Sequence, residues 1–363
     1  MKTISKAGLG VVGALALITI QVSPAHADVA PQASDVVGVG SDTVQFGMDF
    51  LADGDIGGDS GFNTTSTARR VFSFDATGDA AGGATANAQS VLRANSKPIV
   101  RPNGSGAGIT ALLADTGTTE VINFVRSSRL PSTAEQTTAT NNGWGGLRVF
   151  QFATDGLELA VSAATATNAP TGIPVGELVN IYSGVHTTWS QVPGYTGANG
   201  SATIHPYLPQ TGSGTRNFFL ADLQAANGGT AITIGSNVLS MEEHDPTNIQ
   251  NDANAIAPFS TGRFAMDQGG YFGAGKQNVV SLLTASGTYN TTRGLYIIVR
   301  QRDVTDTTGV GGIPFPFQVG GTKNWVQTLF SGTTSWIARG ANGPLIQAAG
   351  LVPSYSDLGL AHS

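Results

Sequence analysis

The chain has 363 residues, no cysteine, 12% charged residues and a formal net charge of −6. The lack of cysteine excludes disulfides, thiolate catalysis, thiolate-held zinc or iron–sulfur sites and a lipid-modified N-terminal cysteine. An acidic chain without a basic run is a poor nucleic-acid binder, so we expect no nucleic-acid partner.

The first 27 residues have the pattern of a secretory signal peptide. Lys2 and Lys6 form a basic start, residues 7–20 are apolar, and residues 25–27 offer small side chains for cleavage. The apolar run is too short to span a bilayer. Removal leaves 18 − 2 = 16 basic and 24 acidic residues, a net charge of −8, in 363 − 27 = 336 residues. We therefore expect a secreted or extracytoplasmic protein, and its length favours two lobes.

Short apolar runs alternate with helical patterns along the rest of the chain, which is typical of an α/β protein. Strands are predicted at 70–74, 119–125, 147–153, 157–161, 202–208, 254–259 and 294–300. Helices are predicted after Ser41, after residue 108, over 174–182, after Ser213, and around 325–330 and 344–349. A turn is predicted at Asp155-Gly156, between two of the strands.

Three glycine- and hydroxyl-rich turns each open into a predicted helix. They are Gly38-Val-Gly-Ser-Asp-Thr-Val-Gln45, Asn103-Gly-Ser-Gly-Ala-Gly-Ile-Thr-Ala-Leu112 and the segment 208–223, which contains Gly212-Ser-Gly-Thr-Arg216. The first N–H groups of a helix lack intrahelical partners and carry partial positive charge, so such turns bind anions. Ordinary capping in a glycine-rich protein is the alternative interpretation. The three turns together predict an oxyanion held between converging helix ends.

Taken in order, these segments resemble the phosphate-binding proteins of bacterial high-affinity phosphate ABC transporters, which are type 2 periplasmic solute-binding proteins. Further matching motifs are Phe124-Val-Arg-Ser-Ser-Arg129, Asp155-Gly-Leu-Glu-Leu-Ala-Val161 and Ile181-Tyr-Ser-Gly184 with Trp189. The resemblance implies two α/β lobes joined by two crossover strands, near 150–162 and 293–300. Lobe 1 would comprise 28–152 and 298–363, and lobe 2 would comprise 153–297.

The resemblance also implies the residues that hold the anion. Carried over by motif, they are Ser41, Asp42, Thr43, Gly104, Ser105, Gly106, Ser127, Ser128, Ser213, Gly214 and Thr215. Two family features are missing, because Ser128 stands where an acidic residue is usual and Pro209 lies where an arginine is usual. Arg126, Arg129 and Arg216 are candidates for the cationic fork. Asp42 is a candidate for the missing proton acceptor, in which case Asp42→Asn should relax discrimination against sulfate.

An enzyme is the weaker hypothesis. Gly58-Asp-Ser-Gly61 is similar to the nucleophile segment of secreted serine proteases, but no histidine lies in a matching context. The histidines have no zinc-binding spacing, and Met241-Glu-Glu-His-Asp245 is interpreted as a solvated loop rather than a metal site. We expect no catalysis, metal or cofactor, a monomer, and an ABC permease as partner. The alternatives are a secreted surface or matrix protein that keeps the fold, and a secreted phosphate-ester hydrolase.

Overall fold

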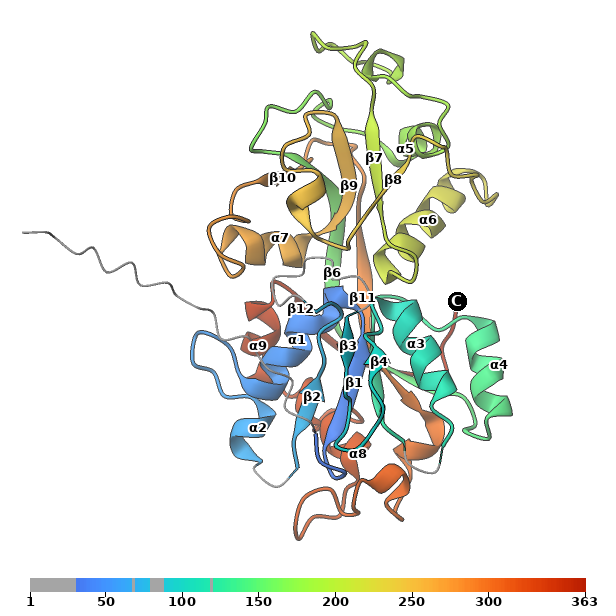
Figure 1. Ribbon diagram of the computed structural model, residues 1–363, viewed down its shortest axis with the longest axis vertical. Coiled ribbons are helices and arrows are strands. Elements are labelled where there is room, and N and C mark those ends of the chain that lie inside the picture. The colour runs from blue at the N-terminus through green and yellow to red at the C-terminus, as the bar shows by residue number, and fades with distance from the viewer. Residues whose placement is uncertain (1–30, 67–68, 79–87, 118–119) are drawn as a thin grey trace, which may run out of the picture.

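The molecule has two lobes joined by two long strands (Figure 1). The computed structural model describes residues 31–66, 69–78, 88–117 and 120–363, and the expected signal peptide lies outside these residues. The helices are α1 (Asp42–Asp53), α2 (Phe62–Thr65), α3 (Ser105–Ala114), α4 (Thr133–Asn141), α5 (Val175–Tyr182), α6 (Gly214–Ala226), α7 (Thr261–Gln268), α8 (Trp325–Leu329) and α9 (Gly343–Ala348).

The strands belong mainly to one sheet that continues through both lobes. They are β1 (Val36–Gly40), β2 (Val71–Ser73), β3 (Gln89–Ser90), β4 (Ile99–Val100), β5 (Phe124–Ser127), β6 (Leu147–Ser162), β7 (His205–Pro209), β8 (Leu239–Met241), β9 (Ala255–Ser260), β10 (Val280–Leu282), β11 (Asn290–Arg300) and β12 (Val352–Gly359). The order is β2-β1-β5-β11-β6-β9-β7-β8, with β10 and β12 also paired to β6, while β3 and β4 form a separate pair.

Lobe 1, the lower lobe in Figure 1, is built on β1, β2 and β5 with helices on both faces. Both faces of β1 are buried because Val36 packs into the cluster with α1, α8 and α9, whereas Val37 and Val39 pack with α3 and α4. A strand covered on both sides needs apolar residues at every position, since successive side chains point to opposite faces. This explains why β1 contains only valine and glycine.

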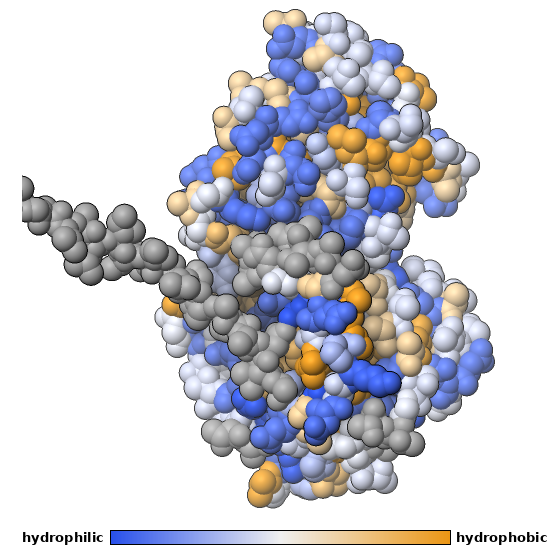
Figure 2. All heavy atoms as spheres, in the orientation of Figure 1, coloured by the Kyte–Doolittle hydropathy of each residue, from blue (hydrophilic) through white to orange (hydrophobic). Residues whose placement is uncertain are grey.

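Lobe 2, the upper lobe in Figure 1, uses β7, β8 and β9 with α5 and α6 on one face. Leu178 and Ile181 of α5 and Phe219 and Leu223 of α6 form the core there. Residues of β9 and β10 pack with Phe264 of α7 in a separate cluster. The glycine- and hydroxyl-rich turns before α1, α3 and α6 lie near the level at which the lobes meet (Figure 1), and the surface narrows at that level (Figure 2).

β6 and β11 are antiparallel and run through both lobes. The predicted turn at Asp155-Gly156 is wrong, because β6 continues without interruption from Leu147 to Ser162. Asp155 lies opposite Arg293 of β11 in the ladder, and a Cβ on Gly156 would lie 2.6 Å from the hydroxyl of Thr261. The glycine therefore serves close packing against α7 rather than chain reversal.

Candidate anion-binding site

The N-termini of α1 and α6, which belong to different lobes, face one another. The hydroxyl oxygens of Thr43 and Thr215 lie 3.3 Å apart. Thr43 is 3% exposed and Thr215 is fully buried, so water does not reach this contact freely. Two of the three predicted turns thus meet at a common point.

Arg293 joins these two threonines from the strand that links the lobes. Its guanidinium donates to Thr215 Oγ1 at 2.6 Å and to Thr43 Oγ1 at 3.3 Å. It also pairs with Asp155 of the neighbouring strand at 2.9 Å and 3.2 Å. The other oxygen of Asp155 accepts hydrogen bonds from the hydroxyl of Ser260 and the backbone N–H of Gly262, at the start of α7. Asp155 thereby fixes the orientation of a buried arginine toward both lobes.

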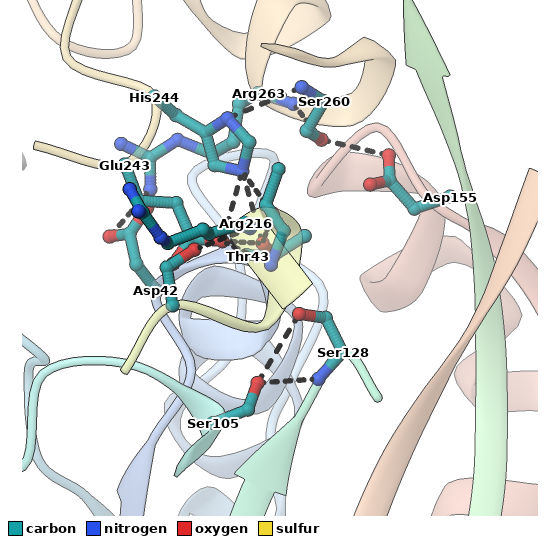
Figure 3. A network of polar contacts seen from close by, with 12 residues as sticks. Asp42, Thr43, Ser105, Ser128, Asp155, Arg216, Glu243, His244, Ser260 and Arg263 are labelled. Atoms are coloured by element: carbon teal, nitrogen blue, oxygen red, sulfur yellow. Dashed lines mark hydrogen bonds and ion pairs between the residues drawn. The ribbon is translucent and has the colours of Figure 1, made fainter. Parts of the chain in front are cut away.

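The third predicted turn meets the same interface beside this arginine. The backbone N–H of Ser128 donates to Ser105 Oγ at 2.9 Å, and the two hydroxyl oxygens are 3.3 Å apart (Figure 3). A Cβ on Gly214 would overlap both hydroxyls, so α6 starts directly over them. The N–H of Gly106 donates to the carbonyl of Gly212 across the lobes at 2.9 Å. Gly104, with φ of +104°, allows this close approach.

Residues 241–245 are a buried part of the interface, and the interpretation as a solvated loop is wrong. Glu243 is fully buried and His244 is 1% exposed. Thr43 donates its hydroxyl proton to Glu243 Oε1 at 3.0 Å, and the N–H of Thr215 donates to the same oxygen at 3.3 Å. The loop is buried because its side chains bridge the two helix ends (Figure 3).

His244 contributes a neutral imidazole to this network. Burial lowers its pKa well below 6.5, and the nearby Arg293 and Arg263 lower it further. The backbone N–H of Ser260 donates to Nδ1, so the ring proton is assigned to Nε2. Nε2–H then donates to Thr43 Oγ1 at 3.0 Å, with Thr215 Oγ1 at 3.4 Å.

Asp42 forms a buried ion pair across the interface with Arg263 of α7. The distance from Arg263 NH1 to Asp42 Oδ1 is 3.2 Å. Burial raises the pKa of Asp42 to about 6, against the opposing effect of Arg263, and the Glu243 carboxylate raises it further. Its second oxygen and the hydroxyl of Ser41 are buried without a hydrogen-bond partner among the described residues. These atoms are available to a guest.

Several predicted residues make other contacts. Arg126 is fully buried and donates to the carbonyls of Gly40 and Ser41 and to the hydroxyl of Ser73, so it supports the first turn from beneath. Arg216 donates through NH1 to the carbonyl of Pro209.

Three more of the predicted residues make local contacts. The hydroxyl of Ser127 donates to the carbonyl of Arg129, at the end of β5. Ser213 caps α6, because its hydroxyl accepts the N–H of Arg216. Arg129 pairs with Glu135 at 2.7 Å, and both line a cavity of about 580 Å³ next to the Gly106–Gly212 contact.

Asp155, Glu243, His244, Arg263 and Arg293 were missed by the sequence interpretation. A signal existed for one pair, since Asp155 and Arg293 are oppositely charged residues within β6 and β11. Glu243 and His244 carried no such signal, because their burial depends on residues of both lobes that are distant in the sequence. Among the described residues no group of His, Cys, Asp and Glu could hold a metal ion. The site offers hydroxyls, helix N–H groups and one arginine fork, which suits oxyanions.

The protease-like motif lies elsewhere. Ser60 is exposed, and its backbone pairs with Gly54 in the loop between α1 and α2. No histidine donates to or accepts from this serine among the residues that the structure describes. In the same part of the chain, no helix is long and apolar enough to cross a membrane.

Two lobes that share two strands and meet through helix N-termini define a two-lobed α/β binding protein with the type 2 periplasmic-binding-protein fold. The chain belongs to the PBP superfamily, because the sequence model described as PBP superfamily domain matches residues 63–331. No curated protein sequence matches the chain.

Solved structures share this fold at low sequence identity. One, assigned as a phosphate ABC transporter substrate-binding protein from Clostridium perfringens with bound phosphate, is 16% identical with a TM-score of 0.53, covering 88% of this chain and 99% of that one. An ABC-type phosphate transport receptor from Vibrio cholerae is 17% identical with a TM-score of 0.52, covering 87% and 99%. A DING protein is 15% identical with a TM-score of 0.52, covering 88% and 91%.

Proposed function

We propose that this chain is an extracytoplasmic solute-binding protein that captures phosphate, or a similar tetrahedral oxyanion, between its lobes without chemistry. The observation that carries the proposal is the guanidinium of Arg293, which donates to Thr43 of one lobe and Thr215 of the other. A guest placed among these groups would hold both lobes at once. Two of the similar solved structures are of phosphate transport proteins, which agrees with this assignment.

We propose Arg293 as the ligand arginine. Its fork is fixed by Asp155 and points to both helix ends, whereas the guanidinium groups of Arg126 and Arg216 are engaged with backbone carbonyls. Arg126, Ser127 and Arg216 are then supports of the site rather than contacts. The guest would be bound by donors and by one acceptor carboxylate, listed here in chain order: Ser41, Asp42, Thr43, Gly104, Ser105, Gly106, Ser128, Ser213, Gly214, Thr215 and Arg293.

Closure of the lobes is the proposed conformational change. Lobe 1 would comprise 28–152 and 298–363, and lobe 2 would comprise 153–297, with the hinge in β6 and β11. The proposed partner is an ABC permease that accepts the closed form, and the protein is proposed to act as a monomer after export.

Calorimetry with phosphate, arsenate, sulfate and molybdate tests this function. Phosphate is expected to bind with a one-to-one stoichiometry, and a chromogenic phosphate ester is expected to be left intact. A protein that releases no heat with any of the four anions would favour the surface or matrix role. Turnover of the ester would favour the hydrolase.

A further inference from the structure

The carboxylate of Glu243 already accepts hydrogen bonds from donors that an anion would use in this site. Its Oε1 accepts a hydrogen bond from the Thr43 hydroxyl at 3.0 Å and from the Thr215 backbone N–H at 3.3 Å. The first donor belongs to the start of α1 in lobe 1 and the second to the start of α6 in lobe 2. One carboxylate oxygen thus bridges the lobes as the proposed guest would.

Within the described part of the chain, Glu243 has no cation of its own. Arg263 is paired with Asp42, and Arg293 is paired with Asp155. His244 lies 3.6 Å away and is neutral, because burial lowers its pKa well below 6.5. The carboxylate is therefore held by a helix N-terminus and hydroxyl groups, which are the groups that also favour an external anion.

The second oxygen of Glu243 is buried without a hydrogen-bond partner among the described residues. A buried carboxylate with one unpaired oxygen keeps a desolvation penalty that its single bonded oxygen does not offset. A tetrahedral oxyanion presents more acceptors to the same donors. Exchange of the carboxylate for the guest is thus physically reasonable.

The backbone next to Glu243 is shaped to deliver this side chain. His244 has φ of +59°, a left-handed conformation that residues other than glycine adopt rarely. The segment lies between β8 and a short 3₁₀ helix at Pro246–Asn248, outside regular structure. Such a segment can withdraw the carboxylate without unfolding α6 or β9.

We infer that Glu243 is an internal competitor for the anion, which holds the lobes together when the site is empty and sets the affinity for the guest. This inference rests on the proposed function. Binding then requires the carboxylate to leave Thr43 and Thr215, so part of the binding free energy is used to displace it. Removing the competing charge is expected to tighten binding.

The test compares Glu243→Gln with Glu242→Gln by calorimetry with inorganic phosphate at pH 7.5. Glu242 gives a matched change of charge one residue away. Its carboxylate accepts from the side chain of Asn103 in the other lobe, an acceptor that the glutamine keeps, and it does not bind the donors of Thr43 and Thr215. Glu243→Gln is expected to lower the Kd at least tenfold, and Glu242→Gln is expected to change it less than threefold. Glu243→Ala repeats the test if the glutamine variant does not fold.

Closure in the absence of phosphate is the second measurement. Small-angle X-ray scattering is expected to give a larger radius of gyration for Glu243→Gln than for wild type or Glu242→Gln. If wild type binds phosphate and Glu243→Gln binds it no more tightly, Glu243 is not a competitor. The proposed function is unaffected by that result. Absence of binding of phosphate, arsenate, sulfate and molybdate in every variant overturns the proposed function, and the competitor with it. Phosphate binding by Glu243→Gln alone supports both.

Discussion

At the scale of single residues, the site is organised by pairs of charges that are buried together. Arg293 and Asp155 lie opposite one another on two strands, and Asp42 and Arg263 meet across the lobes. Breaking such a pair leaves an uncompensated charge and is strongly destabilising, typically by about 3–5 kcal/mol. Variants that test binding must therefore keep the charge balance.

Arg293→Lys meets this requirement. The ammonium keeps a cation beside Asp155, but a lysine cannot donate in a fork to Thr43, Thr215 and a guest together. Phosphate binding is expected to weaken roughly 10- to 100-fold, as for the loss of a charge-assisted hydrogen bond. Calorimetry measures the change, and Arg148→Lys, at a partly exposed ion pair with Asp357, is the control. Equal affinities for Arg293→Lys and wild type would remove Arg293 from the ligand set.

The raised pKa of Asp42 predicts a pH dependence of stability. The folded protein keeps this proton up to about pH 6, while the unfolded chain releases it near 3.8. As the pH rises between these values the unfolded state loses the proton first, so the free energy of unfolding falls, by about 3 kcal/mol for this group. Denaturant unfolding at pH 4 to 7 measures the decline.

Asp42→Asn is the matched variant for this pH series. The free energy of unfolding of this variant is expected to decline less steeply with pH, because the asparagine side chain does not titrate. Part of the slope should remain, since burial also raises the pKa of Asp303 to about 6 and of Glu242 and Asp267 to about 7. Identical profiles for Asp42→Asn and wild type would contradict the assignment.

At the scale of elements, the start of α6 can approach lobe 1 closely because its first residue has no side chain. Gly214 lies directly over the hydroxyls of Ser105 and Ser128, and Ser213 caps the helix. Two adjacent residues therefore carry out the two tasks, one capping the helix and the other making the contact with lobe 1. The serine satisfies the helix N–H group, and the glycine lets the whole helix approach lobe 1.

Gly214→Ala is expected to prevent full closure while leaving α6 folded. The added Cβ would overlap two buried hydroxyls in the other lobe, whereas alanine favours helix formation. Phosphate affinity should fall at least tenfold in calorimetry. Gly176→Ala in α5 is the control, because a Cβ there meets nothing within 4 Å. Wild-type affinity in Gly214→Ala would mean that this approach is not needed for binding.

At the scale of the whole molecule, β6 and β11 are the two strands among the described residues that run through both lobes. The other contacts between lobes are polar at the helix N-termini and aromatic between α1 and the segment that follows α7. Polar contacts are replaceable by water or by a guest, so a hinge in these strands is compatible with the fold. The clusters around α5 and α6 and around α3 and α4 each lie within one lobe and need not change during closure. Phe46 and Phe50 of α1, in contrast, pack against Tyr271 and Phe272 of lobe 2, so these ring contacts would change as the lobes move.

A guest that binds only the folded, closed molecule should stabilise it by mass action. Phosphate at 100 times its Kd is expected to add about 2.7 kcal/mol to the free energy of unfolding. The melting temperature should rise by several degrees in a thermal scan, and by less with sulfate at the same concentration. An unchanged melting temperature at that concentration would contradict binding to the folded state.

The sequence by itself determined the fold class and the order of the elements, because apolar periodicity and the glycine turns are local properties of the chain. α5, β9, α8 and α9 lie close to their predicted ranges. The three turns that meet at the interface were visible as glycines and hydroxyls before helical patterns. These features depend on residues that are close together in the chain, so they could be predicted from the sequence.

Only the tertiary structure decided which charged groups face the proposed guest. Arg126 was a candidate from its motif, but it lies beneath the first turn, while Arg293 reaches the interface from a strand 167 positions along the chain. Glu243 and His244 looked like solvent-exposed residues because their segment is dominated by charged side chains. They are buried by residues distant in the sequence, Thr43 of lobe 1 and Thr215 and Phe259 of lobe 2, and such long-range desolvation leaves no periodicity in the sequence.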